Sequence, residues 1–268
     1  MEPGRVVVVG LDAADWAFLD PWIRAGDLPV LASLVEGGSS GVLASTLPPV
    51  SAPAWATFMT GLRPERHGLF DFIMENPATG LPTLARADLV RGRKLWEAAS
   101  DAGKRSVVLN VPITWPPTPF DGILVTGMLT PDGKNFTHPP EFAEALLREF
   151  PRYRLEYDAA LIGDLPALRT HLSSIAREGA GLMQALLRRE RCDLFVGVFT
   201  TTDRVKHQFW GERETTVRAH YREVDRHLGE VLAAAGPEAT VMVLSDHGFR
   251  SVPVKFYPNR WLAERGLL

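Results

Sequence analysis

Cysteine is almost absent from this sequence, which has only Cys192 in 268 residues. A single thiol excludes an internal disulfide and any metal site built from clustered cysteines. Its surroundings, RCDLFVGVF, are typical of a small buried side chain. The chemistry of the chain therefore has to come from other residue types.

Long apolar runs and clusters of positive charge are also missing. The first apolar run, in MEPGRVVVVGLDAAD, is too short to span a membrane and lacks the small-residue cleavage site of a signal peptide. The formal net charge of -3 comes from interspersed charges, without the basic stripe of a nucleic-acid binder. We therefore expect a cytoplasmic protein that has neither a membrane nor a polymeric nucleic acid as a partner.

The chain does have enough apolar residues, 46%, to bury one substantial core. It shows no internal repeat, no low-complexity tract and no clean linker. We therefore expect residues 1–268 to form a single domain. Residues 130–164 are richer in proline, glycine and aromatic residues, and this stretch is predicted to form an insertion or a lid.

Continuous β-branched runs, typical of strands that are buried on both faces, alternate with helical patterns. The expected strands cover residues 5–10, 106–111, 123–126, 194–199 and 241–244. The expected helices cover residues 28–36, 55–60, 94–102, 140–149, 165–188 and 215–235. This alternation predicts an α/β fold with a mostly parallel central sheet flanked by helices.

Acidic residues follow three of the expected strands. Asp12 comes after the first strand, Asp203 after the fourth, and Asp246 with His247 after the fifth. Ligands of open parallel sheets collect at the carboxyl ends of the strands, so we expect these loops to meet at one edge. Carboxylate and imidazole ligands together suit zinc or another divalent transition metal.

Each of these residues also has an ordinary structural interpretation. Asp203 and His207 stand four apart, so on a helix both point the same way and can bind one ion, but such pairs are also common as solvated polar residues. Asp12 could cap the helix that follows it. Asp246 and His247 are adjacent at the end of an apolar strand and have no packing role there, which favours metal binding for that pair.

Ser51 lies in LPPVSAPAWATFMTG, where Pro53 fits the first turn of a short helix. One interpretation is an N-cap serine. The other is a nucleophile, because free N–H groups at a helix start bind phosphate oxygens and a metal ion bound to the hydroxyl activates it. The pattern alone leaves both open.

Taken together, four motifs resemble a known pattern. They occur in the order GLDAAD, PPVSAPAWATFMTGLRPERHG, TTTDRVKHQFW and SDHGF. This order is similar to that of the type I phosphodiesterase and nucleotide pyrophosphatase family of the alkaline phosphatase superfamily, over residues 6–262. The resemblance implies an alkaline-phosphatase-like catalytic domain with two divalent metal ions, for which Zn2+ is expected.

The resemblance also implies a role for each candidate residue. The residues that look like ligands of one ion are Asp12, Ser51, Asp246 and His247. Those that look like two of the three ligands of the second ion are Asp203 and His207. Ser51, where many relatives have threonine, also looks like the nucleophile that forms a covalent phosphoryl or nucleotidyl enzyme.

Three departures from the family's pattern matter. Ala54 stands where relatives that hydrolyse nucleotides often have an asparagine that hydrogen-bonds the phosphate, and losing such a donor costs roughly a hundredfold in rate. Trp55 stands at the arginine position of the sulfatase signature, which argues against a sulfatase. No histidine follows His247. We therefore expect the third ligand of the second ion to be missing and the domain to be C-terminally incomplete.

Five histidines are not among these candidate ligands. His67, in RPERHG, matches a loop residue of the family and is expected to support the site. His138, in THPPEF, is the only other candidate for the missing ligand. His171, His220 and His227 lie in charged helical patterns and are predicted to be solvated.

The expected function is hydrolysis of small phosphoesters, as a phosphodiesterase or nucleotide pyrophosphatase, through a covalent intermediate on Ser51. The expected partner is a small phosphoester or nucleotide substrate. Two alternatives stay open. One is a phosphomonoesterase or a phosphoglycerate-mutase-like phosphotransferase that reuses the same residues, and the other is an inactive truncated fragment that binds a metal ion or phosphate.

Overall fold

A six-stranded sheet forms the centre of the computed structural model, which describes residues 4–76 and 78–268. Its strand order is β6-β5-β4-β7-β1-β8, and only β6 runs antiparallel to its neighbour. The strands are β1 (Val6–Leu11), β4 (Ser106–Leu109), β5 (Gly122–Val125), β6 (Thr137–His138), β7 (Leu194–Phe199) and β8 (Thr240–Leu244), and a separate hairpin pairs β2 (Ile73–Glu75) with β3 (Pro82–Leu84). The predicted mostly parallel α/β fold is therefore confirmed.

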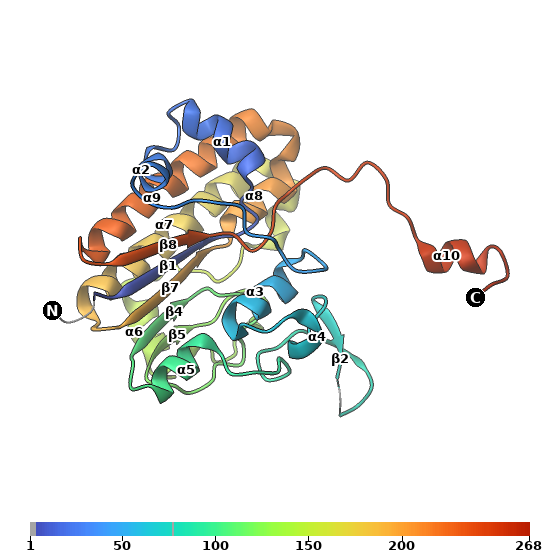
Figure 1. Ribbon diagram of the computed structural model, residues 1–268, viewed down its shortest axis with the longest axis horizontal. Coiled ribbons are helices and arrows are strands. Elements are labelled where there is room, and N and C mark those ends of the chain that lie inside the picture. The colour runs from blue at the N-terminus through green and yellow to red at the C-terminus, as the bar shows by residue number, and fades with distance from the viewer. Residues whose placement is uncertain (1–3, 77) are drawn as a thin grey trace.

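Helices cover both faces of the sheet, with α1, α2, α7, α8 and α9 on one side and α3, α4 and α5 on the other (Figure 1). Their bounds are α1 (Trp16–Arg24), α2 (Pro29–Gly37), α3 (Ser51–Thr60), α4 (Pro64–His67), α5 (Leu95–Asp101), α6 (Phe142–Glu149), α7 (Leu165–Arg189), α8 (Thr201–Phe209), α9 (Arg218–Ala235) and α10 (Pro258–Ala263), with the short 3-10 helices η1 (Ala159–Gly163) and η2 (Trp210–Glu212) and the π-helix η3 (Arg213–Val217). Among the described residues, no helix is both long and apolar enough to cross a membrane.

Alternate residues of each strand face two separate hydrophobic cores. In β1, Val7 and Val9 pack with the helices of the α7 and α9 side, whereas Val8 packs with the α3 and α5 side. Both sets are buried because helices cover both faces, which is why the strands carry continuous apolar runs rather than an alternating pattern. The rigid sheet holds the ends of its central strands in fixed positions.

Helix α1 was not expected from the sequence, because a proline interrupts its pattern. Pro21 lies inside the helix, where its ring and missing N–H normally disfavour helical structure. The helix still forms because Phe18, Leu19 and Trp22 are buried on one face and the Asp15 side chain accepts a hydrogen bond from the Ala17 N–H. Tertiary packing thus outweighs the local preference.

The prediction of solvated histidines is wrong for two of the three residues. His220 and His227 lie on α9, the main partner of α7, and only 3% and 2% of their surface is exposed. His171, at the start of α7, is half-buried. His220 and His227 are spaced along the same stripe of α9 as Val224 and Val231, which are also buried. Their position on that stripe predicts burial better than the charges around them.

Residues 130–164 contain β6, α6 and η1. Strand β6 extends the sheet beyond β5, and Tyr153 is buried in the core. Whether part of this segment closes over a bound ligand stays a prediction. At the other end of the sheet, the chain after β8 leaves the body of the molecule and ends in α10, which buries no residue (Figure 1).

Candidate metal and nucleophile site

Three neighbouring strands, β7, β1 and β8, carry the candidate ligands just beyond their carboxyl ends. Asp12 follows β1, Asp246 follows β8, and Asp203 lies in the first turn of α8, which begins directly after β7. All three carboxylates are at least 90% buried. The loops expected to meet at one edge of the sheet do meet.

Four side chains converge on one point, and we call them the inner group: Asp12, Ser51, Asp246 and His247. One ligand atom from each of Asp12, Asp246 and His247 lies within 4.8 Å of the other two. Ser51 Oγ lies 2.8 Å from His247 Nε2 and 3.5 Å from Asp12 Oδ1. These residues could hold a metal ion with the serine hydroxyl beside it.

The His247 ring is oriented by the backbone. Its Nδ1 lies 2.8 Å from the Gly248 carbonyl oxygen, to which it donates a hydrogen bond when that nitrogen carries the proton. Nε2 then keeps its lone pair and faces Ser51, Asp12 and Asp246. A carbonyl acceptor that fixes the tautomer is the usual support of a metal-binding histidine.

Neither Asp12 nor Ser51 is a helix cap, although the sequence left that interpretation open for both residues. The cap of α1 is Asp15, and the N-cap of α3 is Val50, so Ser51 is the first residue inside that helix. The Ser51 hydroxyl is thus free to face the carboxylates. Pro53 occupies the first turn of α3, as expected.

Trp55 supports Asp12, a role that the sequence did not indicate. Its indole Nε1 donates a hydrogen bond of 3.2 Å to Asp12 Oδ2. The ring is fully buried and fills the space where a Cβ on Gly10 of β1 would lie. Thr202 donates a further hydrogen bond to the Asp12 carbonyl oxygen. Asp12 is therefore fixed through both its backbone and its side chain.

Burial and crowding raise the pKa of both carboxyl groups of the inner group, so these groups bind a proton more readily than usual. Burial, and next the charges of Asp246 and Asp203, raise the pKa of Asp12 well above its ordinary value. Burial also raises the pKa of Asp246 to about 6, although the Ala13 N–H donates a hydrogen bond to it. Carboxylates held this close repel one another when they are charged, so a cation between them would stabilise their charged forms.

Two buried oxygen atoms provide the test of whether the residues fit a metal ion. Asp246 Oδ2 and Asp203 Oδ1 are buried and accept no hydrogen bond from residues 4–76 and 78–268. A buried carboxylate oxygen without a donor is costly unless a cation binds it. Oxygen and imidazole nitrogen are also the donor types that zinc and related ions take. The residues present therefore fit a divalent metal ion.

Asp203 and His207, which we call the outer pair, are arranged more loosely. His207 Nε2 lies 3.4 Å from Asp203 Oδ1, so both side chains do point the same way on α8. The Asp203 side chain is 3% exposed, but that of His207 is 57% exposed. Burial works to raise the pKa of Asp203, yet its contact with His207 and the charge of Arg204 hold that pKa below its ordinary value.

Two basic residues of α8 flank the acidic cluster, and the sequence reasoning missed both. Arg204 contacts Asp203 at 3.2 Å and makes a two-point ion pair with Glu156 from the segment before η1. Lys206 is completely buried and donates hydrogen bonds to the Ala13 carbonyl and, at 3.0 Å, to the Tyr221 hydroxyl. Burial lowers the pKa of Lys206 to about 8, while Asp203 and Asp12 act in the opposite direction.

The two other histidines with a proposed part in the site lie away from the ligands. His67 is buried behind α3, where its ring bonds to Thr57 at 3.0 Å and accepts from the Leu69 N–H. His138 lies on the edge strand β6 and contacts the Phe120 backbone. Its contacts hold it on the opposite edge of the sheet from β8, so His138 does not complete the outer pair.

Solved structures with the same fold include two kinds of hydrolase. Phosphonoacetate hydrolase from Sinorhizobium meliloti 1021, in complex with phosphonoacetate, matches with a TM-score of 0.69 and 19% identity, over 99% of this chain and 62% of its own. Murine ectonucleotide pyrophosphatase / phosphodiesterase 5, as an inactive variant in complex with AMP, matches with a TM-score of 0.59 and 15% identity, over 91% of this chain and 57% of its own. The chain thus spans less than two thirds of these neighbours.

Sequence comparison agrees with the fold. No curated protein sequence matches the chain significantly. The sequence model of one family, however, matches residues 6–268, nearly the whole chain, and includes every residue of the inner group and the outer pair. The chain belongs to the type I phosphodiesterase / nucleotide pyrophosphatase family.

Proposed function

We propose that this protein hydrolyses small phosphoesters, as a phosphodiesterase or nucleotide pyrophosphatase, with Ser51 as the nucleophile. The observation that carries this proposal is the 2.8 Å contact between Ser51 Oγ and His247 Nε2, next to the buried carboxylates of Asp12 and Asp246. A hydroxyl in such surroundings has no packing role. Family membership agrees with this chemistry. A cytoplasmic location also stays a prediction from the sequence.

Asp12, Ser51, Asp246 and His247 would hold one divalent ion and Asp203 with His207 part of a second, and we propose zinc for both. When bound, the ions lower the pKa of the serine hydroxyl and neutralise charge on the phosphoryl oxygens. Trp55 and the Ala13 N–H keep the two carboxylates of the inner group oriented by donating to one oxygen of each. The other oxygen of each carboxylate stays directed at the centre of the group.

In the proposed reaction, Ser51 Oγ attacks phosphorus on the side opposite the leaving oxygen. A Ser51–phosphoryl bond forms as the hydroxyl gives up its proton, and the bond to the leaving alcohol or nucleotide breaks as that group takes up a proton. Water then attacks the same phosphorus, the bond to Ser51 breaks, and the serine regains a proton as the phosphomonoester product leaves. At the start of α3, the Ser51 and Ala52 N–H groups have no hydrogen-bond partner within the described part of the chain, so they can bind a phosphate oxygen. Pro53 and Ala54 add no donor, since one lacks an N–H and the other donates to the Val50 carbonyl.

Hydrolysis assays with a matched leaving group test this proposal. Bis(p-nitrophenyl) phosphate, a diester, should be cleaved faster than p-nitrophenyl phosphate, a monoester, and Ser51→Ala should lower the rate by about a thousandfold or more. Ser33→Ala, at an exposed position of α2, is the matched control and should keep full activity. Faster monoester cleavage would instead support the phosphomonoesterase or phosphotransferase.

The outer pair favours one further candidate, an inactive chain that binds one metal ion or a phosphate. Within the described residues, only Asp12, Asp246 and His247 form a group of three or more ligands close enough for one ion. Among the same residues, Asp203 and His207 have no third ligand close enough to share an ion with them. One bound ion per folded chain, together with no turnover of either substrate, would support this candidate and contradict the first.

A further inference from the structure

Each carboxylate of the inner group and the outer pair has one oxygen held by a protein donor. Trp55 and the Ala13 N–H do this for the two carboxylates of the inner group. For Asp203 the donor is Arg204, whose Nη1 donates to Oδ2 at 3.2 Å, while the buried Oδ1 accepts no hydrogen bond within the described part of the chain. Unlike an indole or a backbone amide, this donor carries a full positive charge, which repels a metal ion.

Glu156 balances that charge. Its Oε1 accepts a hydrogen bond from Arg204 Nε at 3.0 Å and its Oε2 accepts one from Nη2 at 2.5 Å, so two of the three guanidinium nitrogens are directed away from Asp203. The Tyr157 N–H donates to Glu156 Oε1 at 3.1 Å and fixes that carboxylate in turn. Only 17% of the Arg204 side chain is exposed, so solvent ions screen the pair only in part.

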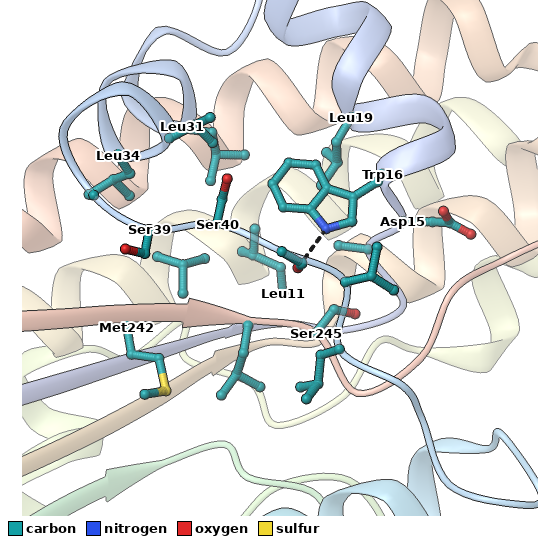
Figure 2. Close-up of a pocket in the computed structure, with 18 of the residues that line it drawn as sticks. Leu11, Asp15, Trp16, Leu19, Leu31, Leu34, Ser39, Ser40, Met242 and Ser245 are labelled. Carbon is teal, nitrogen blue, oxygen red and sulfur yellow. Dashed lines mark hydrogen bonds between the residues drawn. The ribbon is translucent and has the colours of Figure 1, made fainter.

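The segment before η1, and not the groove beside β8, reaches the outer pair. That groove has a volume of about 890 Å³, is lined mainly by apolar side chains and serines, and includes neither Asp203 nor His207 in its lining (Figure 2). Glu156, by contrast, contacts Arg204 from 48 positions away in the sequence. This contact ties residues 130–164, the segment expected to be an insertion or a lid, to the acidic cluster.

The charge of Arg204 also reaches the inner group. Burial and the neighbouring carboxylates raise the pKa of Asp12, and the charges of His247 and Arg204 work against this rise. A cation that weakens the binding of a proton to a carboxylate weakens the binding of a metal ion for the same reason. An Arg204 guanidinium without its partner would therefore disfavour an ion at these carboxylates.

We propose that Glu156 is a positioning residue of the second metal site and acts by holding Arg204 to a single oxygen of Asp203. This inference rests on the proposed ion at the outer pair. While Glu156 binds the guanidinium at two points, its charge is balanced and Asp203 Oδ1 stays open for the ion. Without Glu156, the guanidinium would be free to bind both oxygens of Asp203, the geometry that arginine favours with a carboxylate. The segment before η1 would thus set how tightly the second ion binds.

Isothermal titration of metal-free variants with Zn2+ tests this proposal. Glu156→Ala should weaken the second zinc-binding step about tenfold or more, because the positive charge beside Asp203 loses its partner. Arg204→Met should change this step by no more than about threefold, since the repulsion and the orienting donor disappear together. The double variant should match Arg204→Met, because Glu156 acts on Asp203 only through Arg204. Two merely structural losses would add instead.

Glu149→Ala is the matched control. Glu149 makes the same kind of two-point pair with Arg189, at 2.5 and 2.6 Å, on the exposed surface between α6 and α7. Its removal should leave both zinc-binding steps unchanged. A loss of zinc affinity in this variant equal to that in Glu156→Ala would contradict the proposal, because it would make the effect one of general charge.

A crystal structure of Glu156→Ala without zinc gives a second measurement. It should show Arg204 bonded to both Oδ1 and Oδ2 of Asp203, and a guanidinium that keeps its single contact with Oδ2 would overturn the proposal. Neither this measurement nor the titration uses turnover. A protein that shows both expected results but cleaves neither phosphoester would therefore contradict the proposed function alone.

Three results of the titration would also overturn the proposal. Glu156→Ala could bind the second zinc ion as tightly as the unmodified protein, or the double variant could bind it as weakly as Glu156→Ala. The unmodified protein could also bind no second zinc ion. If hydrolysis that depends on Ser51 persisted in that last case, the proposed nucleophile would stand and the role of Glu156 would not.

Discussion

The inner group and the outer pair differ in how much of a metal site the chain provides. The inner group gathers four side chains from the loops after β1 and β8 and from the start of α3, and the exposed fraction of the His247 side chain is only 11%. The outer pair comes from one turn of one helix, and most of the His207 side chain is in solvent. Ligands from several elements are fixed by the whole fold, whereas two from one helix depend on that helix alone.

This difference predicts two separable binding events. Binding of an ion to the inner group costs its ligands little conformational freedom, because hydrogen bonds already orient both carboxylates. An ion at the outer pair must order the exposed His207 side chain and find ligands beyond the pair. The inner ion should therefore bind first and more tightly, and the predictions below test that order.

The largest expected effect is that of Asp246→Asn. It should lower metal affinity by at least a factor of about 100 and abolish hydrolysis, because the unpartnered Oδ2 is lost as a ligand. The metal-free protein should melt at the same temperature or higher, since one buried charge disappears. Isothermal titration and thermal melts check both, with Asp20→Asn on the surface of α1 as the control. Retained metal and activity would refute the role of Asp246.

His207→Ala should affect only the outer pair. We expect metal content to fall by one ion with the inner ion retained, and the unfolding free energy to change by no more than about 0.5 kcal/mol, because the side chain is exposed. Gln208→Ala, the next residue of α8, should change neither quantity. Atomic emission on the purified protein counts the ions. Loss of both ions would show that the two halves form one cooperative unit.

Lys206→Met should cost about 3 kcal/mol of stability in the metal-free protein. The substitution removes the donor to the Ala13 carbonyl and the buried cation that faces Asp203 and Asp12. Added metal should recover part of this loss, so the metal-induced rise in melting temperature should exceed that of the unmodified protein. Lys134→Met, at an exposed position, is the control. An unchanged rise would mean that Lys206 does not influence the ligands.

The last effect, on acid sensitivity, lies far from the ligands and involves no metal ion. Burial lowers the pKa of His220 to about 4, which Glu223 partly opposes and His227 reinforces. The unfolded chain takes up this proton below pH 6.5, so the stabilisation by neutral His220 is complete above pH 6.5 and is lost as the pH falls towards 4. At pH 5 the loss is about 2 kcal/mol. Chemical unfolding at pH 7.5 and at pH 5, with a chelator present, measures the fall in unfolding free energy between the two pH values. This fall should be smaller for His220→Gln than for the unmodified protein. An equal fall would assign the acid sensitivity to the carboxylates.

The sequence predicts the sheet well because its strands are buried on both faces, which leaves long β-branched runs such as that of β1. It does not predict α1, where tertiary contacts of Trp22 and its neighbours outweigh Pro21. It also misjudges His220, because the charged residues of α9 conceal a buried stripe. For both α1 and His220, contacts with distant elements outweigh the preference that the local sequence indicates.

For the candidate site, the sequence identifies the residues that come together but not what holds them. The motif order marks Asp12, Asp246 and His247, and the structure places one atom of each within 4.8 Å of the others. The supporting groups Trp55 and Lys206 look like ordinary helix residues, since nothing local shows that their polar ends face a carboxylate or a turn. The roles of these residues in catalysis and metal binding stay predictions.

The close packing of the Trp55 ring against Gly10 links the interior of the sheet to the chemistry at its edge. A single methyl group added to β1 would displace the indole and with it the hydrogen bond to Asp12. Variation in the core of this domain is therefore not neutral for the site. Among homologues, a larger residue at this strand position should appear only together with a smaller one in place of the tryptophan, and those pairs should differ in metal preference.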